Sequence, residues 1–293
     1  MSIKLAKFLY KWHHPNLLGG VTRSNIMKHE NIFSQIISLE NLLVAWREFR
    51  RGKRAKSDVA LFEFYLEDNL ITLQTELTQK LYKHKPYESF YINDPKRRHI
   101  HKASVKDRIV HQALFRVLYP IFDKHFIHDS YSSRINKRTH RAVKRLEAFI
   151  GKVSENNRKQ TFVLKCDIKK FFDSIDHKIL FSLVRNYISD KDTFWLLEEI
   201  IKSYGSENGI GLPLGNVTSQ LFANIYLDPL DKFVKNHLRE KYYIRYCDDF
   251  IIVNNDPEYL YKFIPLCKNY LENSLKLNIH KNKTIIRKYS QGI

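Results

Sequence analysis

The sequence predicts an α+β fold in which an antiparallel sheet packs on helices. Much of the chain of 293 residues spaces its apolar residues every three or four positions, as helices do. Three short runs, at 162–166, 242–244 and 250–253, are instead rich in β-branched and aromatic residues, which is typical of buried strands. Because only five residues separate the last two runs, we expect them to form an antiparallel hairpin.

The helical patterns carry recognisable start and stop signals. Ser57 is expected to cap the second helix, Pro120 to end the third, and Pro229 to kink the last. A further strand is expected at 275–280, where apolar and polar residues alternate. The helices themselves are expected at 39–51, 57–69, 107–119, 141–150, 176–187 and about 218–237.

Positive charge dominates the composition. Lys and Arg number 50 against 31 Asp and Glu, so the formal net charge is +19. Such an excess is the electrostatic footprint of a protein that follows phosphate backbones, although helices also carry charge for solubility alone. Two basic clusters stand out, one at 47–56 and one at 137–145.

The compartment signals are those of a cytoplasmic protein. Cys166, Cys247 and Cys267 show no paired metal-ligand spacing and suggest a reduced setting. The first ten residues lack the apolar segment of a signal peptide, and no stretch of about 18 apolar residues could span a bilayer. We therefore expect neither export nor membrane insertion.

Two adjacent carboxylates, Asp248 and Asp249, lie at the expected bend of the hairpin. Ionised carboxylates are costly to bury, so a pair among strand residues indicates a bound cation. A hard ion such as Mg²⁺ is held by carboxylates together with substrate phosphate oxygens, which suits phosphoryl transfer. The alternative is that the pair simply makes the hairpin turn.

A third carboxylate, Asp167, follows the apolar run 162–166 and so ends another expected strand. Three carboxylates could complete the cage that two-metal enzymes use to clamp both oxygens of an in-line phosphoryl displacement. The spacing in the sequence does not by itself make the strands neighbours.

Four blocks then resemble one family when they are taken in order. They are Asp-Arg-Ile-Val-His-Gln-Ala-Leu at 107–114, the block 167–177 that opens with Asp-Ile-Lys-Lys-Phe-Phe-Asp, Gly-Leu-Pro-Leu-Gly-Asn-Val-Thr-Ser-Gln at 211–220, and Tyr-Cys-Asp-Asp at 246–249. Their order and content resemble reverse transcriptases, most of all the bacterial branch with group II intron and retroelement enzymes. The resemblance runs from about residue 40 to the end, so a chance match is very improbable.

This resemblance implies a right-hand polymerase that copies RNA into DNA, a nucleotidyltransferase with template RNA, a DNA or RNA primer and dNTPs as its partners. The fingers and N-terminal helices are expected at 1–155 and the palm at 156–293. The family continues into a helical thumb, but this chain ends at Ile293, where the preceding block should begin. The thumb is therefore expected to be absent or truncated.

The third block narrows the resemblance further. Most reverse transcriptases have Gln-Gly and Ser-Pro where this chain has Leu214-Gly215 and Ser219-Gln220. These residues resemble the enzymes of diversity-generating retroelements, which misincorporate opposite template adenines and work with a small basic accessory protein. The alternatives are a retron, intron or defence-type reverse transcriptase, or a thumb-less RNA-binding remnant without polymerase activity. Leu214 could also be a plain packing residue.

The resemblance implies roles for the acidic residues. Asp167, Asp248 and Asp249 would hold the catalytic Mg²⁺, or Mn²⁺, with the backbone carbonyl of Ile168. Lys283 matches a lysine that protonates the pyrophosphate leaving group, although a surface lysine is the common alternative.

A second set of residues would bind the incoming nucleotide. Lys96 and Arg98 match the fingers segment that meets its triphosphate, and Arg matches phosphate oxygens with its planar fork. Phe172 matches the ring that crowds a ribose 2′-hydroxyl, although it could equally belong to the core. The set is completed by Arg108, Leu214, Gly215 and Gln220, and Arg134 is expected near nucleotide or template.

Overall fold

The computed structural model describes residues 28–93, 97–204 and 209–292, and its centre is a five-stranded sheet in the order β3-β5-β6-β4-β7. The pairs β5–β6, β6–β4 and β4–β7 are antiparallel, and β3 runs parallel to β5. The expected α+β class is therefore confirmed. The strands are β3 (Ser130–Tyr131), β4 (Phe162–Cys166), β5 (Tyr243–Tyr246), β6 (Asp249–Asn254) and β7 (Ile285–Lys288).

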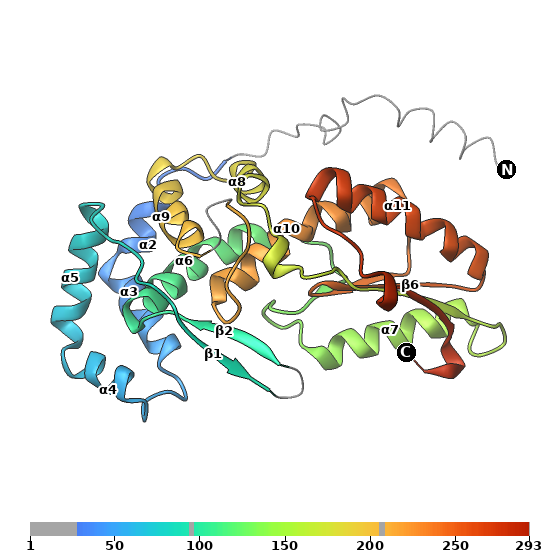
Figure 1. Cartoon of the computed structure of the whole chain (residues 1–293), viewed down its shortest axis with the longest axis horizontal. Helices are drawn as coiled ribbons and strands as arrows, with labels where there is room; N and C mark the ends of the chain where they lie inside the picture. The colour runs from blue at the N-terminus through green and yellow to red at the C-terminus, as the bar shows by residue number, and fades with distance from the viewer. Residues whose placement is uncertain (1–27, 94–96, 205–208, 293) are drawn as a thin grey trace.

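Helices cover both faces of this sheet. Helix α7 (Thr139–Val153) runs along one face, and α11 (Pro257–Leu275) lies on the other (Figure 1). Side chains alternate along the strands, so that Val163 packs with the α7 cluster while Leu164 belongs to the main core. Burial on both faces explains why the strands read as nearly continuous apolar runs.

The N-terminal helices form the other end of the molecule (Figure 1). Helix α6 packs on both α3 and α10 (Val217–Lys232) and so joins this end to the sheet. Trp46 of α3 is fully buried there, and its ring lies 5.2 Å from that of Phe62. The helices are α2 (Phe33–Ile37), α3 (Leu39–Phe49), α4 (Ser57–Phe64), α5 (Leu66–Thr78) and α6 (Val105–Asp123).

A two-stranded hairpin extends from this end toward the sheet (Figure 1). Strand β1 (Glu88–Ile92) pairs antiparallel with β2 (Arg98–Lys102), and their side chains are mostly exposed. An exposed two-stranded ribbon has little core of its own, so it depends on what it touches beyond itself.

Central helices complete the fold. Asp176 and Asp190 cap α8 (His177–Arg185) and α9 (Lys191–Lys202) with their carboxylates. In the described part of the chain, no helix is long and apolar enough to cross a membrane. The remaining elements are α10 (Val217–Lys232), the π-helix η3 (Phe233–His237) and the 3₁₀ turns η2 (Phe172–Ser174), η4 (Lys281–Lys283) and η5 (Tyr289–Gln291).

Several expected boundaries are wrong. The helix expected at 57–69 is interrupted at Tyr65, and Ser57 is the first residue of α4 rather than its cap. Pro120 lies inside α6, which continues to Asp123 because Ile121 and Phe122 are still buried in the core. Tertiary packing therefore overrides the local stop signal.

The strand expected at 275–280 is also wrong. Helix α11 runs to Leu275, and Lys276 ends it in the left-handed region with a φ of 52°. Within the expected span, only Ile279 makes a β contact, an isolated bridge to Ile168. The regular strand comes later, at β7.

A buried tyrosine hydroxyl gives a testable contribution to stability. Tyr226 donates to the Leu275 carbonyl at 2.7 Å and accepts from the Asp176 amide at 3.2 Å, so it joins the ends of α8 and α11. Tyr226→Phe should lower the free energy of unfolding by about 1–3 kcal/mol, because two buried polar groups lose their partner. Urea unfolding measures this, with Tyr261→Phe, at a side chain that is 56% exposed, as the control. Equal stability of the two variants would contradict this role.

Candidate active site

Strand pairing brings the three acidic residues to one edge of the sheet. In the β4–β6 ladder Cys166 lies opposite Phe250, so the next positions on the two strands are Asp167 and Asp249. Tyr246 pairs with Asp249 across the β5–β6 hairpin, which leaves Cys247 and Asp248 as its turn. The predicted hairpin is confirmed, and the strands that carry the acids are neighbours.

The turn itself has an unusual backbone. Cys247 has a φ of 57°, in the left-handed region that residues with a side chain seldom adopt. Its amide lies 3.5 Å from the Tyr131 carbonyl, and the Arg245 amide donates to the Asp129 carbonyl at 3.0 Å. Strand β3 therefore supports the hairpin from its outer side.

The backbone at 278–280 forms hydrogen bonds on either side of Ile168, next to Asp167. The amide of His280 donates to the Asp167 carbonyl, and that of Lys169 donates to the Asn278 carbonyl, both at 2.8 Å. These bonds flank buried Ile168 and leave its own carbonyl out of the bridge. The carbonyl expected to serve as a ligand is thus not used by this pairing.

The same segment delivers Lys283. Its Nζ donates to Asp167 Oδ2 at 2.8 Å, and its side chain is about half exposed. The hydrogen bond to Asp167 raises the pKa of the Lys283 ammonium, and the charges of Asp249 and Asp248 add to the effect. The structure therefore places the candidate proton donor in contact with Asp167, where the charges of Asp248 and Asp249 also act on it.

The charges of the acidic residues oppose one another. Burial raises the pKa of Asp248, and the Asp167 charge raises it further. Burial also raises the pKa of Asp249, with the Asp248 charge as the next cause. A cation would relieve this repulsion, and a set of carboxylate oxygens suits a hard divalent ion. Across the described ranges, no three His, Cys, Asp or Glu side chains already form a ready-made cluster of ligands.

The second and third sequence blocks meet through their backbones. The Leu212 amide donates to the Phe172 carbonyl, and the Gly211 amide donates to the Ile175 carbonyl, both at 2.8 Å. Phe172 begins the turn η2, is half-buried, and meets Phe171 edge-on. It therefore packs against the core while part of the residue stays exposed.

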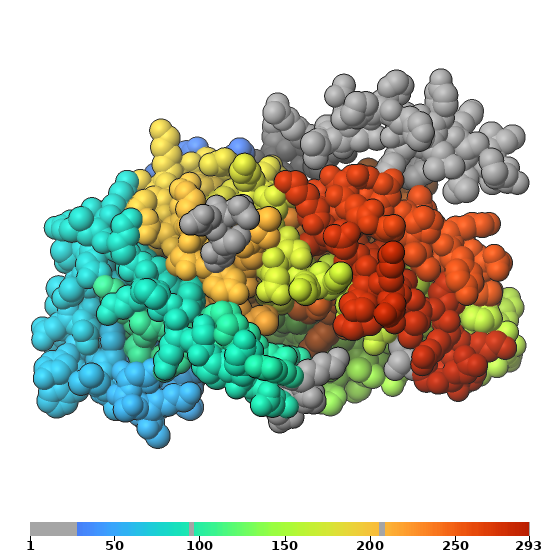
Figure 2. Space-filling view, in the orientation of Figure 1, coloured from blue at the N-terminus to red at the C-terminus, as the bar shows by residue number. Residues whose placement is uncertain are grey.

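The exposed β1–β2 hairpin contacts the third block. The His101 amide of β2 donates to the Leu214 carbonyl at 3.3 Å. Gly215 has a φ of 113°, and a Cβ there would lie 3.5 Å from Ile100 Cγ2. Figure 2 shows the teal hairpin, the yellow-green segment near 170–180 and the red C-terminal segment on one face of the molecule. Gln220 is exposed in the first turn of α10.

The basic residues expected to bind the nucleotide are Lys96, Arg98 and Arg108, and the two that the structure describes do not share one environment. Arg98 is exposed on β2, opposite Ile92, and Lys96 lies outside the described residues. Arg108 instead donates to Asp58 at 2.9 Å and lies over the Phe49 ring, so its side chain joins helices. These contacts do not place Arg108 with the acidic residues.

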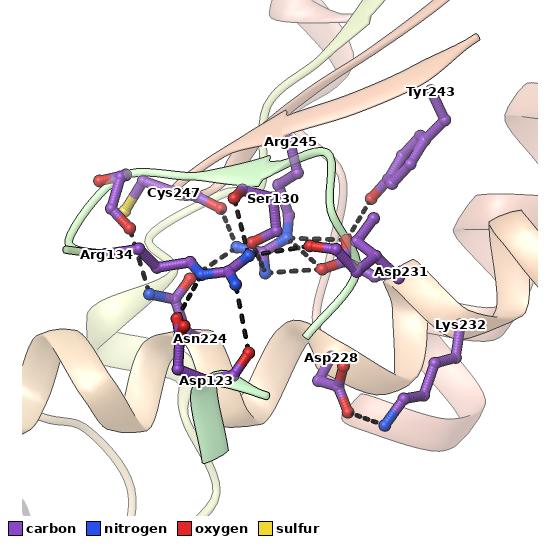
Figure 3. Close-up of polar contacts among 12 residues, drawn as sticks. Asp123, Ser130, Arg134, Asn224, Asp228, Asp231, Lys232, Tyr243, Arg245 and Cys247 are labelled. Atoms are coloured by element: carbon purple, nitrogen blue, oxygen red, sulfur yellow. Dashed lines mark hydrogen bonds and ion pairs between the residues drawn. The ribbon is translucent and has the colours of Figure 1, made fainter. Parts of the chain in front are cut away.

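Arg134 is likewise engaged within its own loop. Its guanidinium donates to the Asp123 carboxylate and to the carbonyls of Ile127 and Ser130 (Figure 3). Only 5% of its side chain is exposed. These bonds give Arg134 a structural role in this loop, and a contact with nucleotide or template stays a prediction.

One residue near the acids received no role from the sequence. Arg245 is a fully buried cation in β5 and forms an ion pair with Asp231 of α10 (Figure 3). Burial opposes its charge, but Asp231 raises the pKa of the guanidinium above its ordinary value. The available signal was a lone charge inside an apolar strand, a position that needs a buried partner.

A family comparison agrees with this arrangement. The family model described as reverse transcriptase (RNA-dependent DNA polymerase) matches residues 84–291. The chain belongs to this family. It is thus placed among the RNA-directed DNA polymerases, enzymes that generally use divalent metal ions, typically Mg²⁺. The mixed helices and sheet agree with a fingers and palm description.

Three named proteins are similar in sequence to this chain. Protein YkfC of Escherichia coli is 26% identical over 260 residues, which are 75% of this chain and 68% of that protein. The group II intron-encoded protein LtrA of Lactococcus lactis is 28% identical over 179 residues, or 58% of this chain and 29% of LtrA. The putative COX1/OXI3 intron 2 protein of Saccharomyces cerevisiae is 22% identical over 353 positions, or 94% of this chain and 40% of that protein. The chain thus spans well under half of these two intron proteins.

The raised pKa of Asp248 predicts a pH-dependent gain in stability. Because the folded-state pKa lies above that of the unfolded chain, ionisation of Asp248 costs stability at pH values above the folded pKa. In the presence of a chelator, Asp248→Asn should raise the Tm at pH 8, by roughly 2–4 °C for each kcal/mol of burial cost and charge repulsion removed. The gain should shrink as the pH falls through the folded pKa.

Thermal unfolding between pH 8 and pH 4 measures this effect. Glu147→Gln, at an exposed acid on α7, serves as the control. A Tm for Asp248→Asn at or below that of the parent chain at pH 8 would show that ionised Asp248 does not lower the stability of the fold.

Proposed function

We propose that this chain extends a primer with deoxynucleotides on an RNA template. The observation that carries the proposal is the strand register, which sets Asp167 at the end of β4 beside Asp249 and the β5–β6 turn, with Lys283 bonded to Asp167. In this proposal Asp167, Asp248 and Asp249, with the Ile168 carbonyl, hold Mg²⁺ or Mn²⁺. When bound, such ions activate the attacking oxygen and neutralise the developing phosphoryl charge.

Lys283 would donate a proton to the departing pyrophosphate. Its raised pKa keeps the ammonium charged at neutral pH, and its 2.8 Å contact with Asp167 holds it at the acids. A proton on a leaving group is worth about 10²–10⁴-fold in rate. The half-exposed side chain leaves room for a phosphate group to replace the carboxylate partner.

The incoming nucleotide would lie between the β1–β2 hairpin and the palm. Lys96 and Arg98 would meet its triphosphate, while Leu214, Gly215 and Gln220 would border the templating pair. The hydrogen bond from His101 to Leu214 supports this placement, since it joins the hairpin to the third block. Phe172 would crowd the 2′ position of the sugar. The engagement of Arg108 with Asp58 favours a structural role for that residue.

Basic surfaces away from the acids would hold the nucleic acid strands. An open pocket between α3 and α4 is lined by Arg47, Arg50, Arg51 and Arg54, of which all but the half-buried Arg50 are exposed. Lys137 to Lys144 supply a second group at the start of α7. Phosphate contacts of this kind dominate affinity and weaken steeply with salt.

The finer proposal is error-prone synthesis in a diversity-generating retroelement, with a small basic protein as partner. It rests on Leu214 and Gln220 in place of the usual Gln and Pro. A hydrogen-bonding side chain lost beside the templating pair would loosen selection of the incoming base. An intron-type enzyme is the second candidate, and the similarity to LtrA and the COX1/OXI3 intron protein favours it.

Primer extension tests the proposed activity directly. The intact chain should extend a primer on an RNA template with Mg²⁺, and the double variant Asp248→Asn with Asp249→Asn should be at least ~10³-fold slower. Asp173→Asn, at an exposed acid in η2, is the matched control and should keep its rate. Failure of the intact chain to extend, or a double variant within tenfold of it, would refute the proposal.

The role of Lys283 predicts a loss in the chemical step. Lys283→Leu should lower the single-turnover rate by about 10²–10⁴-fold at saturating nucleotide, because no acid then serves the leaving group. Lys281→Leu changes an exposed neighbour in the same turn and should have little effect. Equal single-turnover rates for the two variants would remove Lys283 from the mechanism.

The role of Leu214 predicts a change in fidelity. Leu214→Gln should reduce misincorporation opposite template adenines by roughly tenfold, because it restores a hydrogen-bonding side chain. Sequencing of the extension products measures this, and errors opposite the other template bases provide the internal control. Unchanged errors at adenine would leave Leu214 as a packing residue.

A further inference from the structure

Arg245 is surrounded by more partners than an ion pair requires. Its Nε and Nη2 donate to the Asp231 carboxylate at 2.7–3.0 Å, and Nη2 also donates to Ser130 Oγ at 3.0 Å. Its Nη1 donates to Asn224 Oδ1 at 3.1 Å and to the Cys247 carbonyl at 2.9 Å. All five N–H groups of the guanidinium are therefore occupied by partners.

These partners come from separate parts of the fold. Asp231 and Asn224 lie on α10, Ser130 lies on β3, and Cys247 is in the turn (Figure 3). Asp231 has no exposed side-chain surface and also accepts from the Tyr243 hydroxyl at 2.6 Å. The guanidinium thus connects the buried face of the β5–β6 hairpin to helix α10.

The bond to Cys247 is the one that reaches the acids. The Cys247 carbonyl belongs to the peptide group that leads into Asp248, so it sets the direction in which that residue leaves the turn. The left-handed φ of Cys247 is costly for a residue with a side chain and persists only where its surroundings enforce it. The Arg245 bond is a contact able to enforce it.

We propose that Arg245 is a positioning residue that, by holding the Cys247 carbonyl, fixes the backbone of the acidic turn. This inference rests on the proposed function, because the turn matters to catalysis only if Asp248 and Asp249 bind the metal. Arg245 touches neither substrate nor metal, and it acts through the backbone and through its link to Asp231.

The chemistry of arginine suits this role. Its planar guanidinium presents donors in several fixed directions, whereas lysine has a single ammonium on a flexible stem. A lysine at position 245 could keep the ion pair with Asp231. It would lack the rigid fork that reaches the Cys247 carbonyl at the same time.

The test uses the whole chain and two readouts. Mn²⁺ binding is followed by electron paramagnetic resonance of the free ion, and primer extension gives kcat and the nucleotide KM. Arg245→Lys should weaken Mn²⁺ binding about tenfold and lower kcat by a similar factor, with the nucleotide KM within about twofold, since supporting contacts typically tune a metal site by 10–100-fold. Asp248→Asn with Asp249→Asn shows which part of the Mn²⁺ signal belongs to the turn.

A matched control separates positioning from general stability. Arg116→Lys makes the same change at a partly buried arginine of α6, which bonds to Asn41 and Glu48 of α3. It should lower the Tm but leave Mn²⁺ affinity and kcat unchanged. A folded Arg245→Lys that behaves in the same way would overturn the proposal.

A second variant covers a failure to fold. Asp231→Glu keeps the charge but moves it by one methylene, so it should shift the guanidinium and weaken Mn²⁺ binding in the same direction. Unfolding of both variants would make the pair a folding determinant and overturn the positioning role. An intact chain that binds Mn²⁺ at the turn but does not extend a primer would refute the proposed function, while the Mn²⁺ titration would still decide the role of Arg245.

Discussion

The pairing of β4 with β6 is the interaction on which the candidate site depends. Their antiparallel register sets the end of β4 beside the start of β6, and this alone brings Asp167 to Asp249 across 82 positions of sequence. A slip of β4 by one residue would exchange its two faces and turn the buried Leu164 away from the main core. Packing of helices on both faces makes that slip costly, so the core holds the acidic residues in register.

The acidic residues at this edge of the sheet repel one another, and a lysine lies beside them. Burial and mutual repulsion raise the pKa of Asp248 and Asp249, while Lys283 offsets part of the negative charge at Asp167. Beneath the turn, Arg245 and Asp231 form a fully buried pair with every donor satisfied. Such a pair contributes modestly when intact but costs about 3–5 kcal/mol when one partner is removed. Removing either Arg245 or Asp231 would therefore destabilise the fold beneath the acidic turn.

Local patterns predicted the strands that carry the acids. The strand at 162–166 and the two strands of the hairpin around Asp248 are rich in β-branched and aromatic residues, which favour strands. The two hairpin strands are also close in sequence, so their pairing could be predicted. The strand at 275–280 failed because α11 continues through Leu275, where packing on the sheet favours helix over the alternating pattern. The stop at Pro120 failed for the same reason, since the helix buries residues on both sides of it.

The side-chain partners were harder to predict, because they depend on contacts distant in sequence. Nothing near Arg108 in sequence indicates Asp58 as its partner, and nothing near Arg245 indicates that Asp231, Ser130 and the turn carbonyl converge on it. The lone charge in a strand signalled a buried partner without naming one. The block that includes Lys283 was found by resemblance, and the structure adds its direct contact with Asp167.

Anomalous X-ray diffraction from a crystal of the whole chain with Mn²⁺, primer–template and an incoming nucleotide would test the central claim most directly. The account predicts Mn²⁺ peaks bounded by Asp167 and the turn that carries Asp248 and Asp249, with the nucleotide phosphates on their open side. An ordered nucleotide with Mn²⁺ bound elsewhere, and none at this edge of the sheet, would contradict it.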